Sequence, residues 1–435
     1  MERDKIKVLL VCHFSNANVR EHLPLDDRKW YNRIRHVLGM PEKKGGYADL
    51  ASWDTNLIDI LSKREDVELH VISAHSGLKR SAVHFHIGNV DYCFLRCEVA
   101  TGLKRVISSP AVWNFLNPMR FAVHKIAYRV QPDVIALIGA ENAYISGTVL
   151  GLEKKYPVIV KAQTIYNNPE RSKFGVVDLK NAYVEKMIFD KIKYFSVTTK
   201  MHNAIFRQFN KTAYNLKWRF GTTYPDVRKV AKEFDFVNFA MAMIDKKGFH
   251  DAVKALAIVR MKYPNASLNL VGGGTREEVQ AVKDLISQYG LENQVTLTPL
   301  FEKQADMFQH IQKARFALLP CKMDYVSSTV RQAMHYGLPV ICYSTEGTVT
   351  LNNGMDRVLI AENGDVEDLA AKMTMFMDHP EVAAVLAKAA KEDVDCKNDN
   401  VMIAEEIVSA LKAVVANFKN GTLIPEALLY DKVNL

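Results

Sequence analysis

The sequence predicts an α/β protein with two domains, each built on a mainly parallel sheet that is covered by helices. Buried-strand patterns alternate with helical patterns through both halves of the chain. The chain has 435 residues, more than one ordinary hydrophobic core holds, and this length indicates two domains. Its content of 48% hydrophobic and 24% charged residues is typical of soluble globular proteins.

The first half begins with a buried strand at 6–12, close to the chain start as in doubly wound folds. A helix is expected at 49–61, and further strands at 67–73, 133–138, 157–162 and 194–198, the last of this half. The carboxyl ends of parallel strands share one edge of a sheet, so the polar residues that follow them should lie close together. These residues are His13, Glu141, Asn142, Gln163, Tyr166 and Asn167, and each alone is more often structural than catalytic.

A long irregular stretch at 13–46 separates the first strand from the first helix and ends in Gly45 and Gly46. A connection of this length inside a compact domain is more often functional than idle. The paired glycines would let a ligand approach the backbone closely, although a plain turn is the interpretation that we favour.

The second half begins near 221–226 and repeats the alternation of strands and helices. Strands are expected at 236–243, 268–271, 295–297, 316–319, 340–343 and 358–360, with helices at 248–261 and 366–377. Gly272, Gly273 and Gly274 follow one of these strands and precede a helix, an order that is typical of phosphate cradles. The pattern is neither Gly-x-Gly-x-x-Gly nor a P-loop, so a tight turn is an equal alternative.

The stretch 317–342 contains the pattern on which the functional prediction depends most. It is expected to form a strand, a loop, a short helix, a turn and a strand. Ser327, Ser328 and Thr329 are residue types that begin helices, and Gly337 with Pro339 suits the end of one. The free backbone N–H groups at such a helix start attract phosphate, so we expect half of a nucleotide-sugar site here. The alternative is an ordinary connection between two strands.

The stretch from Thr101 to Gln131 contains no acidic residue. Lys104, Arg105, Arg120, Lys125 and Arg129 alternate there with Trp113, Phe115, Phe121 and Tyr128. A basic and aromatic helix of this kind can lie on an anionic membrane surface. The interpretation that we favour is that the aromatic rings pack on the sheet while the charges face water.

Several other classes of protein and site are disfavoured by the sequence. The six cysteines show no paired framework, so we expect reduced thiols in a cytoplasmic protein rather than disulfides or a zinc site. The N-terminal residues lack the apolar core of a signal peptide, and no apolar run is long enough to span a membrane. The formal net charge of +8 is mild, and the basic residues are scattered, which argues against a nucleic-acid partner.

Residues from about 236 to 390 resemble the donor-binding domain of retaining glycosyltransferase family 4, which has the GT-B fold. The motifs that carry the resemblance are Lys247-Gly248, Gly272 to Gly274, Pro320, Ala333-Met334, Gly337-Leu-Pro-Val340 and Asn363-Gly-Asp365, in the family's order and spacing. The resemblance implies two Rossmann-like domains facing a central cleft and a C-terminal helix, such as 403–418, that returns to the first domain. We therefore expect an acceptor-binding domain at 1–222, a donor-binding domain at 223–402, and a helix and tail at 403–435.

The resemblance also implies roles for particular residues. Lys247 would pair with the donor diphosphate, and backbone N–H groups at Tyr325, Val326, Ser327 and Ser328 would hold phosphate or sugar oxygens. The two glutamates of the family pattern fall on Asp324, beside the reacting sugar, and on Gln332, beside the ribose. The catalytic-loop histidine of the family falls near Gln163, and the arginine before the Lys-Gly turn falls on Ala242.

Each assignment has a structural alternative. Without the resemblance, Lys247 would be interpreted as a solvated lysine in a turn. Thr329 and Gln332 have the spacing of a helix capping box, so Gln332 would cap the helix. With the resemblance, we favour phosphate binding for Lys247. The expected catalytic residues are thus Asp324, Lys247 and Gln163, and the expected donor-binding residues are Gly272, Gly273, Gly274, Tyr325, Val326, Ser327, Ser328 and Gln332.

The sequence therefore predicts a retaining glycosyltransferase that moves a sugar from a nucleotide-diphosphate sugar to a glycan or lipid-linked acceptor, in the synthesis of cell-surface polysaccharide or glycolipid. No metal or other cofactor is expected, because no Asp-x-Asp pair stands at a strand end of the second domain. The protein is expected in the cytoplasm, with peripheral contact at the inner membrane face through 101–131 as an open alternative. A catalytically degenerate GT-B module that binds sugar nucleotide or glycan without turnover is the second hypothesis, and a sugar-nucleotide epimerase of related fold is the third.

Overall fold

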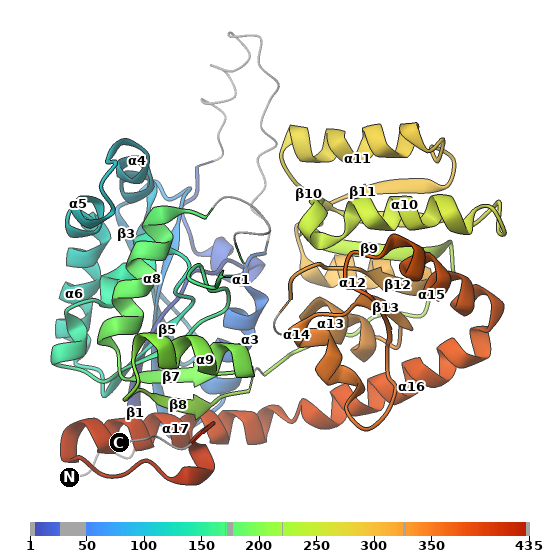
Figure 1. Ribbon diagram of the computed structural model, residues 1–435. Coiled ribbons are helices and arrows are strands. Elements are labelled where there is room, and N and C mark those ends of the chain that lie inside the picture. The colour runs from blue at the N-terminus through green and yellow to red at the C-terminus, as the bar shows by residue number, and fades with distance from the viewer. Residues whose placement is uncertain are drawn as a thin grey trace, which may run out of the picture. The chain divides into compact units, whose positions relative to one another are not determined.

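The computed structural model describes residues 5–26, 49–169, 171, 177–219, 221–324 and 328–431 (Figure 1). The chain forms two compact units, of which unit 1 contains Met1–Thr222 and Asn400–Leu435 and unit 2 contains Thr223–Asp399. The chain thus re-enters unit 1 at Asn400, three residues before the boundary expected at 403. Most of the irregular stretch at 13–46, with both of its glycines, lies outside the described residues.

Unit 1 contains an eight-stranded sheet in the order β3-β4-β2-β1-β5-β6-β7-β8. Its strands are β1 Ile6–Val11, β2 Val67–His75, β3 Ala82–Ile87, β4 Val90–Arg96, β5 Val134–Ile138, β6 Val158–Lys161, β7 Tyr194–Val197 and β8 Tyr214–Lys217. Only the edge strand β3 runs antiparallel, against β4. The expectation that the strand at 194–198 ends this half was wrong, because β8 pairs with β7. The strands β3 and β4 were also not expected.

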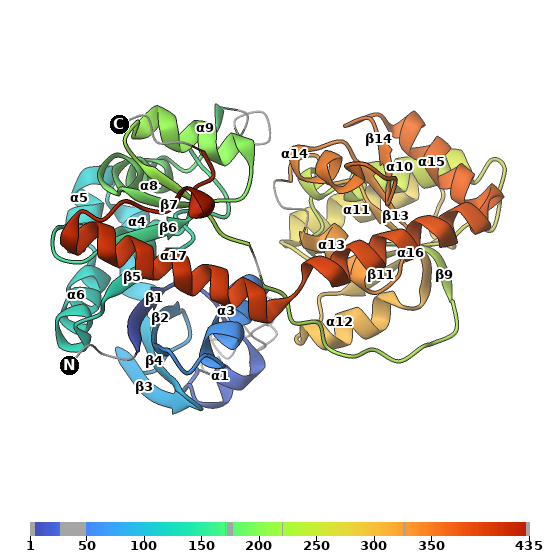
Figure 2. The same ribbon diagram turned by 90° about the horizontal axis from the view of Figure 1, so that it is seen from below.

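Helices cover both faces of this sheet. They are α1 Ala17–Glu21, α3 Ser52–Ser62, α4 Glu98–Val106, α5 Pro110–Phe115, α6 Pro118–Val130, α7 Ala143–Ser146, α8 Leu179–Lys191, α9 Lys200–Phe209 and α17 Asn400–Asn420. Alternate residues of β1 enter different cores: Leu9 and Val11 pack with side chains of α5 to α9, whereas Val8 and Leu10 pack with α3 and α17. The expected return helix is therefore α17, which Figure 2 shows lying across the strands of unit 1.

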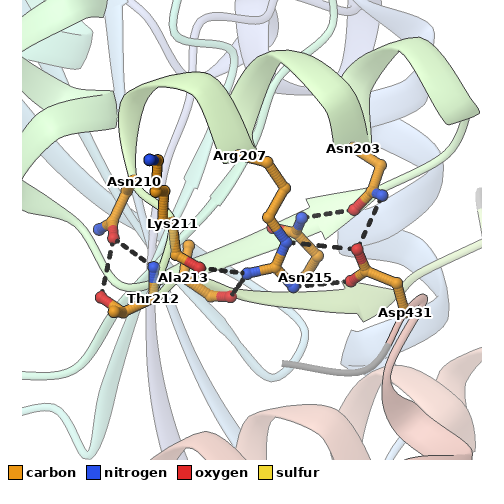
Figure 3. A network of polar contacts seen from close by, with 8 residues as sticks. All are labelled: Asn203, Arg207, Asn210, Lys211, Thr212, Ala213, Asn215 and Asp431. Atoms are coloured by element: carbon orange, nitrogen blue, oxygen red, sulfur yellow. Dashed lines mark hydrogen bonds and ion pairs between the residues drawn. The ribbon is translucent and has the colours of Figure 1, made fainter. Parts of the chain in front are cut away.

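The chain after α17 extends the edge of the same sheet. Tyr430 donates its backbone N–H to the Asn215 carbonyl of β8 at 2.7 Å. The Asp431 carboxylate accepts from the Arg207 guanidinium at 2.7 and 3.2 Å and from the Asn203 amide at 2.8 Å (Figure 3). Burial of the Asp431 carboxyl opposes ionisation, but these donors prevail and lower its pKa. They fix the tail to unit 1.

The aromatic residues of 101–131 only partly follow the interpretation that we favoured from the sequence. Trp113 is fully buried against the sheet, and its indole N–H donates to the Ala100 carbonyl at 3.1 Å. Phe115 and Phe121, however, are 72% and 76% exposed, so the expectation that they pack on the sheet was wrong.

Unit 2 contains a six-stranded, fully parallel sheet in the order β11-β10-β9-β12-β13-β14. Its strands are β9 Phe234–Ala242, β10 Leu268–Gly273, β11 Val295–Pro299, β12 Ala314–Leu319, β13 Val340–Tyr343 and β14 Leu359–Ala361. Its helices are α10 Phe249–Val259, α11 Arg276–Gln288, α12 Gln304–Ile311, α13 Ser328–His335, α14 Glu346–Val349, α15 Val366–Asp378 and α16 Pro380–Lys397. Two hydrophobic clusters, one on each face, enclose this sheet.

The strand order of each unit reverses direction once. In unit 1 the chain first adds strands on one side of β1 and then crosses over, so that β5 pairs with β1 on the other side. In unit 2, β12 pairs with the other side of β9 in the same way. Ligands of open α/β sheets bind beyond the carboxyl ends of the strands at this reversal. The chain leaves β1 at His13 and β5 before Glu141, and it leaves β9 before Lys247 and β12 before Asp324. Each unit therefore carries predicted site residues at its reversal point.

Candidate functional site

In unit 2, the turn after β9 packs directly on the loop after β12. Gly248 ends the 3₁₀ turn Asp245–Lys247 with a φ of 75°, a conformation that favours glycine. A Cβ atom on Gly248 would meet the Pro320 carbonyl oxygen at 2.0 Å. The Lys322 backbone N–H donates to the Lys246 carbonyl at 3.0 Å and joins the two segments again. The Lys-Gly turn and the Pro320 loop thus form a single support.

An ion pair with a buried carboxylate strengthens this support. The Lys322 ammonium lies 2.8 Å from Asp245 and 3.1 Å from the carboxylate of Asp251, a residue that is only 2% exposed. The Tyr343 hydroxyl donates to the same Asp251 carboxylate at 3.0 Å. Burial opposes the charged ammonium, but hydrogen bonds and the two carboxylates prevail and raise the pKa of Lys322. Lys322 is therefore committed to structure.

Lys247 and Asp324 both lie within electrostatic reach of the Cys321 thiol. Burial raises the pKa of that thiol, the Lys247 charge lowers it and the Asp324 charge raises it further. Within the part of unit 2 that the structure describes, the half-buried Lys247 ammonium has no hydrogen-bond or ion-pair partner. Unlike Lys322, it is available to an anion. The structure thus places both predicted catalytic residues near the same thiol, at the support that the Lys-Gly turn and the Pro320 loop form.

The remaining loops at this edge of the sheet are joined to the Pro320 loop. The Asp324 carbonyl accepts from the Gly347 N–H at 3.0 Å, which connects it to the start of α14. The Asn363 side chain donates to the Lys322 carbonyl at 2.9 Å, and the Asn363 N–H donates to the Ser344 hydroxyl at 3.2 Å. The loops after β9, β12, β13 and β14 therefore form one rigid edge.

Helix α13 begins at this edge. Tyr325, Val326 and Ser327 lie outside the described residues, whereas Ser328 is the first described residue of the helix. Thr329 lies within the helix and not at its N-cap, so the capping-box alternative for Gln332 is wrong. Ala333 and Met334 anchor the helix in the core, which leaves half-buried Gln332 on another side.

The three glycines after β10 have packing roles in the structure. A Cβ on Gly272 would meet the Ala240 carbonyl oxygen of β9 at 2.7 Å, and one on Gly274 would meet the Glu278 carboxylate at 2.9 Å. The start of α11 is closed by a capping box between Thr275 and Glu278, and its first turn carries two carboxylates. A helix start of this kind repels phosphate. The geometry therefore favours the tight-turn alternative over a phosphate cradle.

In unit 1, Gln163 lies beside Glu141. Backbone N–H groups of Gln163 and Thr164 hydrogen-bond the Glu141 carboxylate, but burial prevails and raises the pKa of Glu141 to about 7. A Cβ on Gly139 would meet this carboxylate at 2.9 Å, so the strand end is shaped around it. The sequence prediction that residues after β5 and β6 meet is correct for this pair.

Two more buried carboxyl groups surround Glu141. Asp54 of α3 is 2% exposed, and burial together with the Glu141 charge raises its pKa. Glu185 of α8 is fully buried and accepts from the backbone N–H groups of Tyr166 and Asn167 at 2.9 and 2.8 Å. Burial raises the pKa of Glu185 to about 7 despite these donors. Tyr166 and Asn167 thus support Glu185.

His13 lies at the same reversal point and contacts Tyr144 of α7. The Tyr144 hydroxyl is 3.1 Å from the His13 ring nitrogens, and the two rings meet edge to face. Burial lowers the pKa of His13 to about 4, so the imidazole is neutral at physiological pH. Asn142 begins α7 without a side-chain capping bond.

Three polar atoms near this point are buried without a hydrogen-bond partner within the described residues: Glu141 Oε2, Gln163 Nε2 and Arg171 Nη1. The Arg171 charge acts on Glu141, and its guanidinium lies 3.9 Å from the centre of the Tyr166 ring. An unpaired buried donor or acceptor is costly unless a ligand completes it. One acceptor and two donors match a hydroxyl-rich ligand, whose hydroxyl groups both donate and accept.

Four residues of these two sites were not predicted from the sequence: Asp54, Arg171, Glu185 and Lys322. Asp54, Glu185 and Lys322 are charged residues on helices or loops, where the usual expectation is exposure to water. No spacing rule marks them, and only the folded chain shows that Asp54 and Glu185 are buried and that Lys322 pairs with a buried carboxylate. Among the described residues, no helix is long and apolar enough to cross a membrane, and no group of three metal-ligating side chains is present.

Parts of this chain match known sequences. Residues 222–393 match the family described as glycosyl transferases group 1. An uncharacterized glycosyltransferase of Haemophilus influenzae is 22% identical over 200 residues, covering 44% of this chain and 55% of that protein. A glycogen synthase of Mycobacterium tuberculosis is 26% identical over 188 residues, covering 42% of this chain and 43% of that protein. The chain therefore spans about half the length of these curated relatives.

Two solved structures resemble the fold along nearly the whole chain. Sucrose-phosphate synthase from Thermosynechococcus elongatus has a TM-score of 0.69 at 15% identity and covers 95% of this chain and 99% of its own. The Anabaena protein HepE in complex with UDP and glucose has a TM-score of 0.65 at 17% identity and covers 94% and 100%. At these identities the likeness concerns the fold, which is the α/β fold of GT-B glycosyltransferases.

Proposed function

We propose that this protein, whose residues 222–393 match the family of glycosyl transferases group 1, is a retaining glycosyltransferase that uses a nucleotide-diphosphate sugar. The observation that carries the proposal is the Lys247 ammonium, which has no hydrogen-bond or ion-pair partner among the described residues and lies, like Asp324, near the Cys321 thiol at the strand reversal of unit 2. This is the place where open α/β sheets bind nucleotides. The neighbouring cation, Lys322, is occupied by carboxylates, which leaves Lys247 for the diphosphate.

The chemistry at unit 2 would be electrostatic. When the sugar leaves the diphosphate, negative charge accumulates on the departing oxygen, and a fixed cation at that point lowers the barrier. Lys247 supplies the charge, and the rigid edge of loops holds it in place. The first turn of α13, at Ser328, would add backbone N–H groups, Gln332 would hold the ribose, and Asp324 would accept from the sugar hydroxyls. This arrangement needs no metal ion.

The acceptor would bind unit 1 at the buried atoms of Glu141, Gln163 and Arg171. One acceptor and two donors without partners among the described residues support a hydroxyl-bearing acceptor, such as a glycan or the sugar of a lipid-linked acceptor. A product of this kind suits the synthesis of cell-surface polysaccharide or glycolipid. The neutral His13 and the nearby carboxyls would orient the acceptor hydroxyl.

A thermal-shift panel tests the donor half of the proposal. Sugars linked to UDP, GDP, ADP and CMP are added in turn, and a donor that binds only the folded protein raises the melting temperature. The donor that stabilises the wild type should lose this effect in Lys247→Met. Equal stabilisation of both proteins would contradict the assignment. Transfer that EDTA abolishes and manganese restores would refute independence from metal.

A catalytically degenerate module is the second candidate. It is favoured by Ala242, Asp324 and Gln332, which stand where the resembling family has arginine and two glutamates. Calorimetry with nucleotide diphosphates, followed by assays of donor hydrolysis and transfer, separates the two candidates. Binding without either reaction for any donor would support the degenerate module.

A further inference from the structure

Helices α4 to α6 of unit 1 carry an exposed apolar surface, which we call the α4–α6 surface. Its members are Val106, Val112, Phe115, Leu116 and Phe121. Val106, Phe115 and Phe121 are 81%, 72% and 76% exposed, and no other phenylalanine of the described residues is exposed above 37%. Figure 1 shows the three helices one after another along one flank of unit 1. Large exposed apolar side chains gathered on neighbouring helices are typical of interaction sites.

The outward direction of these side chains is fixed by the packing of the opposite helix faces. Trp113 is fully buried between Val112 and Phe115, and its indole holds α5 to the Ala100 carbonyl. Asn117 is 1% exposed, caps α6 through the Met119 N–H and donates to the Tyr144 carbonyl at 2.8 Å. The two phenylalanines on either side of Asn117 therefore cannot turn inward without breaking these anchors.

Positive charge borders the apolar side chains. Arg105, Lys125 and Arg129 are exposed, and no carboxylate interrupts residues 101–131. Lys125 follows Phe121 by one helical turn and therefore lies on the same face. The Lys155 ammonium lies 4.6 Å from the centre of the neighbouring Tyr128 ring and adds a fourth cation. Two carboxylates on neighbouring segments engage other partners: Glu98 pairs with Arg96, and Glu153 accepts from the Gly151 N–H.

Two of the five basic residues in this stretch have structural roles. Lys104 pairs with Asp178 at 2.8 Å and donates to Asn181 at 2.7 Å. The Arg120 guanidinium donates to the Leu150 carbonyl at 2.8 Å. A test of surface charge must therefore use Arg105, Lys125 and Arg129 and leave Lys104 and Arg120 in place.

We propose that the α4–α6 surface docks on an anionic membrane, with Phe115 and Phe121 inserted among the lipid headgroups and Arg105, Lys125 and Arg129 facing the lipid phosphates. Phenylalanine with lysine and arginine on one surface is the combination that interfacial helices use. Charge complementarity selects anionic lipid over an apolar protein face, because no carboxylate balances the three exposed cations within this stretch. The proposal does not depend on the proposed transfer reaction.

The test is co-sedimentation of the full chain with vesicles of phosphatidylcholine alone or mixed with phosphatidylglycerol. Wild type should bind only the anionic vesicles, and added salt should weaken the binding. Charge reversal at Arg105, Lys125 and Arg129 should weaken it at least about tenfold. Phe115→Ser with Phe121→Ser should also weaken it, with the melting temperature unchanged because both side chains are already exposed.

Matched controls separate this surface from general effects of charge and hydrophobicity. Reversal of the exposed Lys229, Lys283 and Lys388 of unit 2 changes the net charge equally and should leave binding unchanged. Met261→Ser removes an apolar side chain that is 81% exposed and should also have no effect. Equal binding by the two charge-reversed proteins would overturn the proposal. A second pair of results would also overturn the proposal. These are a wild type that does not bind anionic vesicles and forms a dimer in solution, and a Phe115→Ser, Phe121→Ser variant that is a monomer.

Discussion

Gly248 lies so close to Pro320 that a Cβ atom on it would stand 2.0 Å from the Pro320 carbonyl oxygen. The contact joins the turn that carries Lys247 to the loop that carries Asp324. Gly248 and Pro320 are 72 positions apart in the sequence, and they meet because β9 and β12 are neighbours in the sheet. The proposed diphosphate site is built on this contact.

Gly248→Ala should destabilise unit 2 by about 2–4 kcal/mol, because the new Cβ overlaps backbone and φ is positive. Gly354→Ala is the matched control, since Gly354 has a φ of 77° with nothing within 4 Å of its Cβ position. Gly354→Ala should lower the free energy of unfolding only by the backbone strain, about 1 kcal/mol. Urea unfolding of both variants measures the difference. Equal losses would show that the close approach to Pro320 has no energetic weight.

Lys247→Met should weaken binding of the nucleoside diphosphate by about 10- to 100-fold, because a charge-assisted contact contributes about 1.5–3 kcal/mol. The melting temperature without ligand should not change, since Lys247 has no partner within the described part of unit 2. Isothermal calorimetry provides the affinity. Lys283→Met, at an exposed lysine of α11, is the control and should bind as wild type. An unchanged affinity for Lys247→Met would remove Lys247 from the site.

Glu141→Gln should make the stability of unit 1 less sensitive to pH. The pKa of Glu141 is raised from 4.5 to about 7, so the folded state holds a proton that the unfolded state releases between these values. The contribution is fully present below pH 4.5 and is lost as pH rises through 7. Its size is at most about 3.4 kcal/mol, for a shift of about 2.5 pKa units at 1.36 kcal/mol per unit.

The difference in unfolding free energy between wild type and Glu141→Gln, measured from pH 5 to 8.5, isolates this contribution. The comparison is needed because His13, with a pKa lowered to about 4, changes stability in the opposite sense between about pH 4 and 6.5. Glu65→Gln, at an exposed glutamate, is the control, and its difference in unfolding free energy from wild type should not change with pH. A flat difference for Glu141→Gln as well would show that its carboxyl ionises as freely as in the unfolded chain.

Asp431→Asn should loosen the C-terminal tail from unit 1 and cost about 1–2 kcal/mol, since the carboxylate accepts charge-assisted hydrogen bonds from Arg207. Its pKa is lowered, so the stabilisation is present above the usual aspartate pKa and is lost as pH falls through the folded value. Hydrogen exchange of the Tyr430 amide, which bonds to Asn215, reports the loosening. An unchanged exchange rate would place the anchor elsewhere in the tail.

The sequence alone determined the alternation of strands and helices, the two-unit organisation and the motifs of unit 2. These features depend on local periodicity and on turn residues such as Gly248 and Gly337, which leave a pattern along the chain. The edge strands β3 and β8 were missed because half-exposed strands lack the continuous apolar run of buried parallel strands. The residues Gln163 and Glu141 were expected to meet because both follow strands of one parallel sheet.

The tertiary structure decided which charges are buried and which apolar side chains are not. Lys322 and Glu185 look like surface residues in the sequence, yet the folded chain surrounds them, and Phe115 looks like a core residue, yet it faces solvent. A residue type gives the cost of burial, but the partners that offset this cost come from strands and helices that are distant in the sequence. For this reason, only the folded chain distinguishes Lys247, whose ammonium has no partner among the described residues, from the occupied Lys322.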